Sequence, residues 1–187
     1  QESGWAFQKE DKILAVLDTD GDGVDEILVR DAESAGLGFL EYGGGGQQDP
    51  GSEETTKDHI YIKKFYALSL GNWQLTANDT FEGVGDFNND GKEDFILRNA
   101  SGLGVIGVEG SFLHTAYATI SSGQSFTIPR GASWSYQRGP VSAIADIDGN
   151  GYDEIIIKNL TGQFAVITLT PDNFALREVF GGSNTSF

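Results

Sequence analysis

The stretch LDTDGDGVDEILV, residues 17–29, decides how this sequence is interpreted. Acidic residues and glycines alternate over its first half, and an apolar run follows at once. Oxygen-bearing side chains at alternate positions can converge on a hard cation, and glycine permits the sharp reversal that wraps a chain around it. The stretch therefore predicts a metal-binding turn that leads directly into a β-strand.

The same pattern occurs three times along the 187 residues. The acidic runs begin at Asp18, Asp86 and Asp146, and a tryptophan precedes each at a nearly constant distance. Self-similarity at a fixed period of this size is typical of solenoids, propellers and repeat arrays. The sequence therefore predicts three copies of one structural unit.

Each copy continues in the same way after its acidic run. An apolar strand follows and ends at a basic residue, and a polar turn and further apolar strands come next; the basic residues are Arg30, Arg98 and Lys158. Four antiparallel strands per repeat are typical of a propeller blade. Small residues in the strand before each loop, such as Gly83 and Gly85, suit an innermost strand where blades crowd together.

We therefore expect an all-β, β-propeller-type fold of three four-stranded antiparallel blades in one domain, residues 1–187. The expected repeats are residues 1–64 with a long insertion at 43–58, residues 65–128, and residues 129–187. Closed propellers have about 4–8 blades, so three blades should leave open edges. Three alternatives follow: a piece of a larger propeller, a ring completed by two chains as a homo-oligomer, or a compact non-standard arrangement.

The loops supply only oxygen ligands. Counted from the first aspartate, positions 1, 3, 5 and 9 carry side-chain oxygens, position 6 is glycine, and the carbonyl of position 7 can complete the shell. Without sulfur or clustered imidazole, Ca²⁺ is the natural occupant, giving up to three structural ions. The candidate ligands are Asp18, Asp20, Asp22, Val24 and Glu26; Asp86, Asn88, Asp90, Lys92 and Asp94; and Asp146, Asp148, Asn150, Tyr152 and Glu154.

An EF-hand begins in the same way but requires a bidentate glutamate at position 12 and a helix on each side. Position 12 here is Val29, Leu97 and Ile157, all within strand-like runs. The EF-hand interpretation therefore fails in all three loops.

A ligand set that closes at position 9 inside a β-hairpin resembles the FG-GAP/VCBS repeat, the calcium-binding blade of integrin α-subunit propellers and of many secreted bacterial proteins. The stretch GVGDFNNDGKEDFILRN, residues 83–99, is especially similar to the bacterial form. The resemblance covers nearly the whole chain and implies ligands at positions 1, 3, 5 and 9 with the position-7 carbonyl. Glu26 and Glu154 depart from the family's aspartate at position 9, and the Phe-Gly and Gly-Ala-Pro signatures are degraded.

The number of carboxylates distinguishes loop 1 from the other two loops. Loop 1 carries four carboxylates at positions 1, 3, 5 and 9 and the other two carry three each, so loop 1 should bind Ca²⁺ most tightly. The additional acids at position 8, namely Asp25, Glu93 and Asp153, are expected to face solvent. Carboxylate clusters repel themselves without metal, so we expect calcium-dependent stability.

The composition excludes several classes of binding partner and site. The formal charge of −16, from 28 acidic and 12 basic residues, argues against nucleic acid and anionic membranes, which need clustered Lys and Arg. The absence of cysteine excludes disulfides and thiolate sites, and no apolar run approaches the ~18 residues of a membrane span. A start at Gln1 without methionine is expected of a processed or excised chain.

The leading functional hypothesis is a non-enzymatic, calcium-stabilised module for extracellular, cell-surface or periplasmic recognition and adhesion, binding a glycan or a protein through blade loops. The alternatives are an ancillary domain of a secreted polysaccharide-active or other surface enzyme, and a structural spacer. No catalytic residues are assigned within the chain. Trp5, Trp73 and Trp134 are weak candidates for carbohydrate stacking, and packing between blades is the favoured role of these repeated tryptophans.

Overall fold

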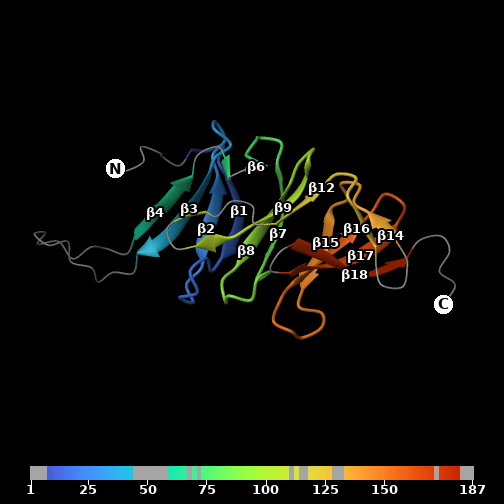
Figure 1. Ribbon diagram of the computed structural model, residues 1–187. Coiled ribbons are helices and arrows are strands. Elements are labelled where there is room, and N and C mark those ends of the chain that lie inside the picture. Colours follow the sequence, from blue (N-terminus) through green and yellow to red (C-terminus); the bar gives the residue numbers. More distant parts are fainter. Residues whose placement is uncertain are drawn as a thin grey trace, which may run out of the picture.

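The computed structural model describes residues 8–43, 59–66, 69–70, 73–109, 112–113, 118–127, 133–170 and 173–181. All regular elements in these ranges are β-strands, which form three four-stranded antiparallel sheets and three two-stranded hairpins (Figure 1). The prediction of an all-β fold with four antiparallel strands per repeat is confirmed. The described strands do not close into a ring, so the propeller-type arrangement stays a prediction. The same residues hold no helix long and apolar enough to cross a membrane.

The three sheets follow one another along the chain. The first sheet contains β1 (Lys12–Leu17), β2 (Glu26–Arg30), β3 (Leu37–Gly43) and β4 (His59–Tyr66), paired in that order. The second contains β7 (Thr80–Gly85), β8 (Asp94–Arg98), β9 (Gly102–Ile106) and β12 (Ala118–Ser121). The third contains β15 (Val141–Ala145), β16 (Glu154–Lys158), β17 (Gln163–Thr170) and β18 (Asn173–Gly181).

The hairpins lie between these strands in sequence. They pair β5 (Ser69–Leu70) with β6 (Trp73–Gln74), β10 (Val108–Glu109) with β11 (Phe112–Leu113), and β13 (Ser125–Thr127) with β14 (Ser133–Ser135). Most of the expected insertion at 43–58 lies outside the described residues.

Each acidic loop joins the first two strands of its sheet, and all three strand pairs share one register. The residue before each loop faces the position-9 acid across the ladder, as in Leu17 with Glu26, Gly85 with Asp94, and Ala145 with Glu154. Each pair also has a register shift at the equivalent place in its first strand. The repeat found in the sequence is therefore a repeat of backbone geometry as well.

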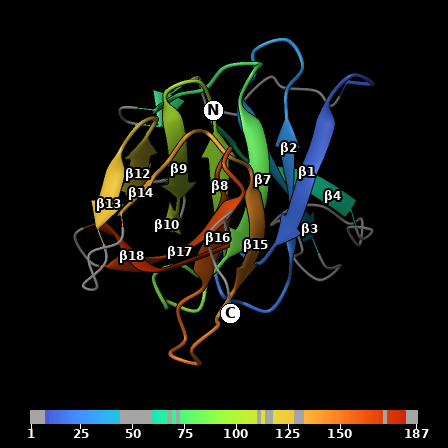
Figure 2. The same ribbon diagram turned by 90° about the vertical axis from the view of Figure 1, so that its right-hand side faces the viewer.

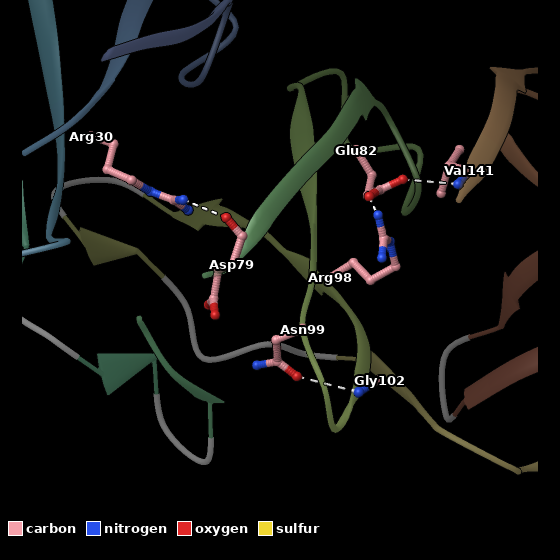
Figure 3. Close-up of polar contacts among 7 residues, drawn as sticks. All are labelled: Arg30, Asp79, Glu82, Arg98, Asn99, Gly102 and Val141. Atoms are coloured by element: carbon pink, nitrogen blue, oxygen red, sulfur yellow. Dashed lines mark hydrogen bonds and ion pairs between the residues drawn. The ribbon is translucent and has the colours of Figure 1, made fainter. Parts of the chain in front are cut away.

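The polar turn after the second strand also repeats. Its first residue is Asp31, Asn99 or Asn159, and the side-chain oxygen accepts backbone N–H groups two or more residues later. In the second sheet, Asn99 Oδ1 accepts the N–H group of Ser101 at 2.8 Å. It also accepts the N–H group of Gly102 at 3.3 Å (Figure 3). Such Asx turns satisfy the backbone groups that the reversing chain leaves unpaired.

The core lies between neighbouring sheets, and the second sheet contributes to both sides of it. Side chains alternate across a strand, so Phe95 and Leu97 of β8 pack with the first sheet while Ile96 packs with the third. Strands buried on both faces read as continuous apolar runs, which accounts for the run at residues 95–97.

The first strands of the sheets lie side by side, β1 next to β7 and β7 next to β15 (Figure 2). Glycine is required where β7 meets β15, because a Cβ atom on Gly85 would stand 2.7 Å from Ile144 Cγ2. The expectation that small residues allow close approach of these strands is confirmed at Gly83 and Gly85. The three acidic loops project from the same end of the molecule (Figures 1 and 2).

Candidate metal centres

The first aspartate of each loop organises the backbone that follows it. The N–H of the position-6 glycine donates to Oδ2 of position 1 at 2.9 Å in every loop: Gly23 to Asp18, Gly91 to Asp86, and Gly151 to Asp146. The position-5 side chain in turn accepts the N–H of position 7, which is Val24, Lys92 or Tyr152, at 2.8–3.0 Å. Each loop is therefore wound tightly around its own oxygen-bearing side chains.

Two positions in each loop have positive φ. Position 6, expected to be the turning point, has φ of 79–89°. Position 4 is also left-handed, with φ of 76° at Gly21, 57° at Asn89 and 75° at Gly149. Sequence reasoning missed position 4, although glycine and asparagine, the residues that tolerate this conformation, stand there in all three loops.

Loop 3 brings three carboxylates together. One oxygen each from Asp146, Asp148 and Glu154 lies within 4.8 Å of the others. Glu154 is 2% exposed and its Oε2 accepts the Ile147 N–H at 3.0 Å, but its buried Oε1 has no hydrogen-bond partner among the residues that the structure describes. A buried carboxylate oxygen without a donor is unfavourable unless a cation balances it. Loop 3 therefore fits a hard cation.

Loop 1 gathers Asp18, Asp20 and Asp22 within the same 4.8 Å limit. Glu26 is fully buried at the base of this loop, where its Oε2 accepts the Thr19 N–H at 3.0 Å and the Thr19 hydroxyl at 2.5 Å. Loops 1 and 3 thus share one closing contact, in which the position-9 carboxylate accepts the position-2 N–H.

Loop 2 differs because Asn88 replaces an acid at position 3. Its carbonyl oxygen accepts the Asp90 N–H at 2.9 Å, and Asp86 accepts the same group at 3.2 Å. Asp94, at position 9, is buried. The clusters of three carboxylates among the described residues are those of loops 1 and 3, so the site in loop 2 and the carbonyl ligands at position 7 stay predictions.

Two of the three acids at position 8 bind a neighbouring loop and do not face solvent as expected. Glu93 Oε2 accepts the Asp18 N–H at 2.8 Å, and Asp153 Oδ2 accepts the Asp86 N–H at 2.9 Å, so each reaches the preceding loop. The expectation that they face solvent is wrong for both residues, because the backbone N–H that each satisfies belongs to a different repeat. Asp25 is exposed, as expected.

Two of the basic residues that end the second strands make contacts beyond their own strand pair. Arg98 Nε lies 2.6 Å from Glu82 Oε1, and Glu82 Oε2 accepts the Val141 N–H of the third sheet at 2.9 Å (Figure 3). Arg30 donates to the backbone carbonyl of Asp79, and burial lowers the pKa of Arg30 while the Asp79 carboxylate opposes that shift. Arg98 thus pairs with an acid that also binds the third sheet, whereas Lys158 Nζ lies 5.4 Å from the centre of the Phe164 ring in its own sheet.

The two tryptophans that the structure describes do not present stacking faces. Trp73 is 6% exposed and Trp134 is 1% exposed, and both lie in the core clusters between sheets. Trp73 Nε1 donates to Asp79 Oδ2 at 2.9 Å, which fixes the ring in the interior. Trp5 lies outside the described residues.

No protein-family model matches the chain, and no curated protein and no solved structure matches it significantly. The assignment of the loops therefore depends on their own chemistry. They offer only oxygen donors, two of them gather three carboxylates, and one leaves a buried carboxylate oxygen unpaired. This donor set fits Ca²⁺.

Proposed function

We propose that this protein is a calcium-binding, non-catalytic recognition module of extracellular or periplasmic space, in which the ions stabilise the loops and through them the packing of the sheets. The observation that carries the proposal is the buried, unpaired Oε1 of Glu154 beside Asp146 and Asp148. Three carboxylates held this close repel one another, and a divalent cation offsets that repulsion.

The side chains that would hold the ions are those at positions 1, 3, 5 and 9 of each loop. Ca²⁺ would supply charge balance and a rigid coordination shell there, without redox or acid–base chemistry. Asp18 and Asp86 also make the backbone contacts to the following repeat, through Glu93 and Asp153. Ion binding in loops 1 and 2 is therefore coupled to the contact between neighbouring sheets.

The proposal includes membership of the FG-GAP/VCBS type, with each sheet acting as a propeller blade. Three loops of the form D-x-[DN]-x-[DN]-G-x-x-[DE], each joining the first two strands of a four-stranded antiparallel sheet, support it. The packing of β1, β7 and β15 side by side also favours it, since the first strands of propeller blades meet around a common axis.

Recognition of a glycan or a protein is proposed for the loop surfaces. All three acidic loops project from one end of the molecule, so ions bound there would rigidify a single shared surface (Figure 1). Rigid presentation lowers the entropy lost on binding a partner. A glycan array probed with and without Ca²⁺ tests this part: a calcium-dependent hit supports recognition, whereas silence from folded protein contradicts glycan binding.

Isothermal titration of metal-free protein with CaCl₂ tests ion binding. We expect three sites, with loop 1 the tightest, and MgCl₂ as a weaker competitor because Mg²⁺ loses its water reluctantly. Asp146→Asn combined with Asp148→Asn should remove one site and leave two. An exposed acid outside the loops, Glu33→Gln, is the control and should leave all three. Absence of saturable Ca²⁺ binding to folded protein would refute the proposal.

A further inference from the structure

The second sheet is flanked on both sides, and its two contacts follow one pattern. Position 1 of one loop and position 8 of the next exchange two hydrogen bonds: the Asp18 N–H donates to Glu93 Oε2 at 2.8 Å, and the Glu93 N–H donates to the Asp18 carbonyl at 2.8 Å. Asp86 and Asp153 repeat this exchange, with both distances 2.9 Å. One polar clasp therefore joins each sheet to the next.

The apolar part of the contact repeats as well. Val84 and Phe81 of β7 pack into the cluster shared with the first sheet, and Ile144 and Val141 of β15 pack into the cluster shared with the second. The receiving strand offers small side chains, as Gly83 and Gly85 do beneath Ile144. Each sheet thus has an inserting face and a receiving face.

The first sheet shows its inserting face to solvent. Val16 and Ile13 occupy the register positions of Val84 and Phe81, and they are 56% and 60% exposed. Asp25, at position 8, is exposed and has no hydrogen-bond partner among the described residues. Every group that inserts into a neighbour in the second and third sheets is therefore present here without one.

The third sheet shows its receiving face in the same way. Ala143 and Ala145, at the positions of Gly83 and Gly85, are exposed. Ile147, at loop position 2, is 52% exposed, whereas its counterpart Phe87 is fully buried in the core shared with the next sheet. Within the described part of the chain, the Asp146 N–H has no acceptor.

We propose that a second copy of this chain covers these faces head to tail, with Val16 and Asp25 of each copy seated on Ala143, Ala145 and the Asp146 N–H of the other. The two contacts continue the interface already present twice within the chain. A two-fold dimer contains both contacts at once and brings six sheets together, a number that closes into a propeller. This inference shares with the proposed function the packing of the sheets as blades, but it does not require ion binding, so the mass measurement and the calcium titration can fail independently.

Light scattering after gel filtration, in calcium-containing buffer, tests the stoichiometry. We expect twice the 20.1 kDa mass of the chain. Val16→Arg and Ala145→Arg each place a charge in both contacts of a two-fold dimer, so each variant should run at the monomer mass. Both positions are exposed in the chain, and an unchanged circular dichroism spectrum verifies the fold. Monomeric wild type at all concentrations, or open-ended assemblies larger than a dimer, would overturn the proposal.

Mixing the two variants identifies the faces. A head-to-tail pair of Val16→Arg with Ala145→Arg retains one contact between two native faces, so the mixture should recover dimer that neither variant forms alone. A symmetric face-to-face dimer would instead be broken by only one variant, and that result contradicts the proposal. Leu160→Arg is the control, because Leu160 is 80% exposed and its counterpart Ala100 is exposed even in the flanked second sheet.

Cysteine pairing provides a second measurement that does not depend on disrupting the dimer. The chain has no cysteine, so the double variant Val16→Cys with Ala145→Cys places one pair of thiols, and no other thiol, in each of the two contacts. Mild oxidation should give a covalent dimer on a non-reducing gel. Val16→Cys with Leu160→Cys should stay monomeric on that gel. Equal cross-linking of the two double variants would overturn the assignment of the faces.

Discussion

Asp153 and Asp86 hold each other across the boundary between two repeats. The Asp86 N–H donates to Asp153 Oδ2 and the Asp153 N–H donates to the Asp86 carbonyl, both at 2.9 Å. Asp86 is also the residue around which loop 2 is wound, since it accepts the Gly91 N–H through Oδ2. Asp86 therefore couples the packing of the third sheet to the conformation of loop 2.

Asp153→Ala should lower both the free energy of unfolding and the affinity of loop 2 for Ca²⁺. The substitution leaves the Asp86 N–H without its carboxylate acceptor, which costs about 1–3 kcal/mol. Asp153→Asn keeps an oxygen acceptor and should lose less. Urea denaturation and calcium titration measure the two effects. Glu33→Ala removes an equal charge from an exposed turn and should stay within about 0.5 kcal/mol of wild type. Equal losses for Asp153→Ala and Glu33→Ala would contradict the role of the clasp.

Gly85→Ala should destabilise the contact between β7 and β15. An added Cβ would lie 2.7 Å from both Ile144 Cγ2 and Asp153 Oδ2, and overpacking of this kind costs about 1–3 kcal/mol. Ile144→Ala removes one of the two obstructing groups, so the cost of Gly85→Ala should fall in that background. A double-mutant cycle by urea denaturation measures this coupling. Strict additivity would show that the two residues do not meet.

The sequence predicted the features whose causes lie within one repeat. The loops at Asp18, Asp86 and Asp146 could be located because ligand spacing and turn-forming glycines are local properties. The strands that follow them could be located because residues buried on both faces leave a continuous apolar run, as at residues 95–97.

The contacts between repeats could not be predicted from one repeat, because the partner is distant in sequence. Glu93 and Asp25 stand at the same loop position, yet Glu93 binds the preceding loop and Asp25 is exposed. Phe87 and Ile147 differ in the same way, one fully buried and one half exposed. Equivalent residues of the three repeats have the same sequence pattern whether their sheet face is covered or exposed. Only the arrangement of the sheets shows which of these residues are buried.

Tyr136→Phe should extend the alkaline stability of the protein. Burial raises the pKa of Tyr136 from its ordinary value of 10.0 to about 12, with smaller effects from Arg98, which lowers the pKa, Glu82, which raises it, and Arg138, which lowers it. Because the folded state favours the neutral phenol, its contribution to stability is complete below pH 10 and is lost as pH rises through 12. The variant should therefore lose less stability than wild type across this range.

The same substitution should be tolerated at neutral pH. The Tyr136 hydroxyl is buried and has no hydrogen-bond partner within the described ranges of the chain, so its removal leaves no new unsatisfied group there, and we expect a change within about 1 kcal/mol. Thermal melts at intervals from pH 7 to pH 12 measure both effects. If the melting temperatures of the two proteins fell in parallel from pH 7 to pH 12, another group would be responsible for the loss of stability at alkaline pH.

Glu154→Gln should reverse its effect on stability when calcium is added. Without metal, the amide removes one of three repelling carboxylates and can donate to Asp146 or Asp148, while its carbonyl can still accept the Ile147 N–H, so the variant should melt at or above wild type. With excess Ca²⁺, wild type gains the binding energy of loop 3 and the variant gains less, so the order of the melting temperatures inverts.

Melting scans in EGTA and in excess CaCl₂ measure this inversion, and Glu33→Gln is the matched control that should shift both scans equally. A variant that is destabilised to the same extent in both buffers would show that Glu154 is required only for its hydrogen bond to Ile147. A wild-type protein with the same melting temperature in EGTA and in CaCl₂ would show that the loops do not bind calcium in the folded state. The inversion requires both a repelling cluster without metal and an ion that relieves it, so it separates a metal centre from a set of solvated acidic turns.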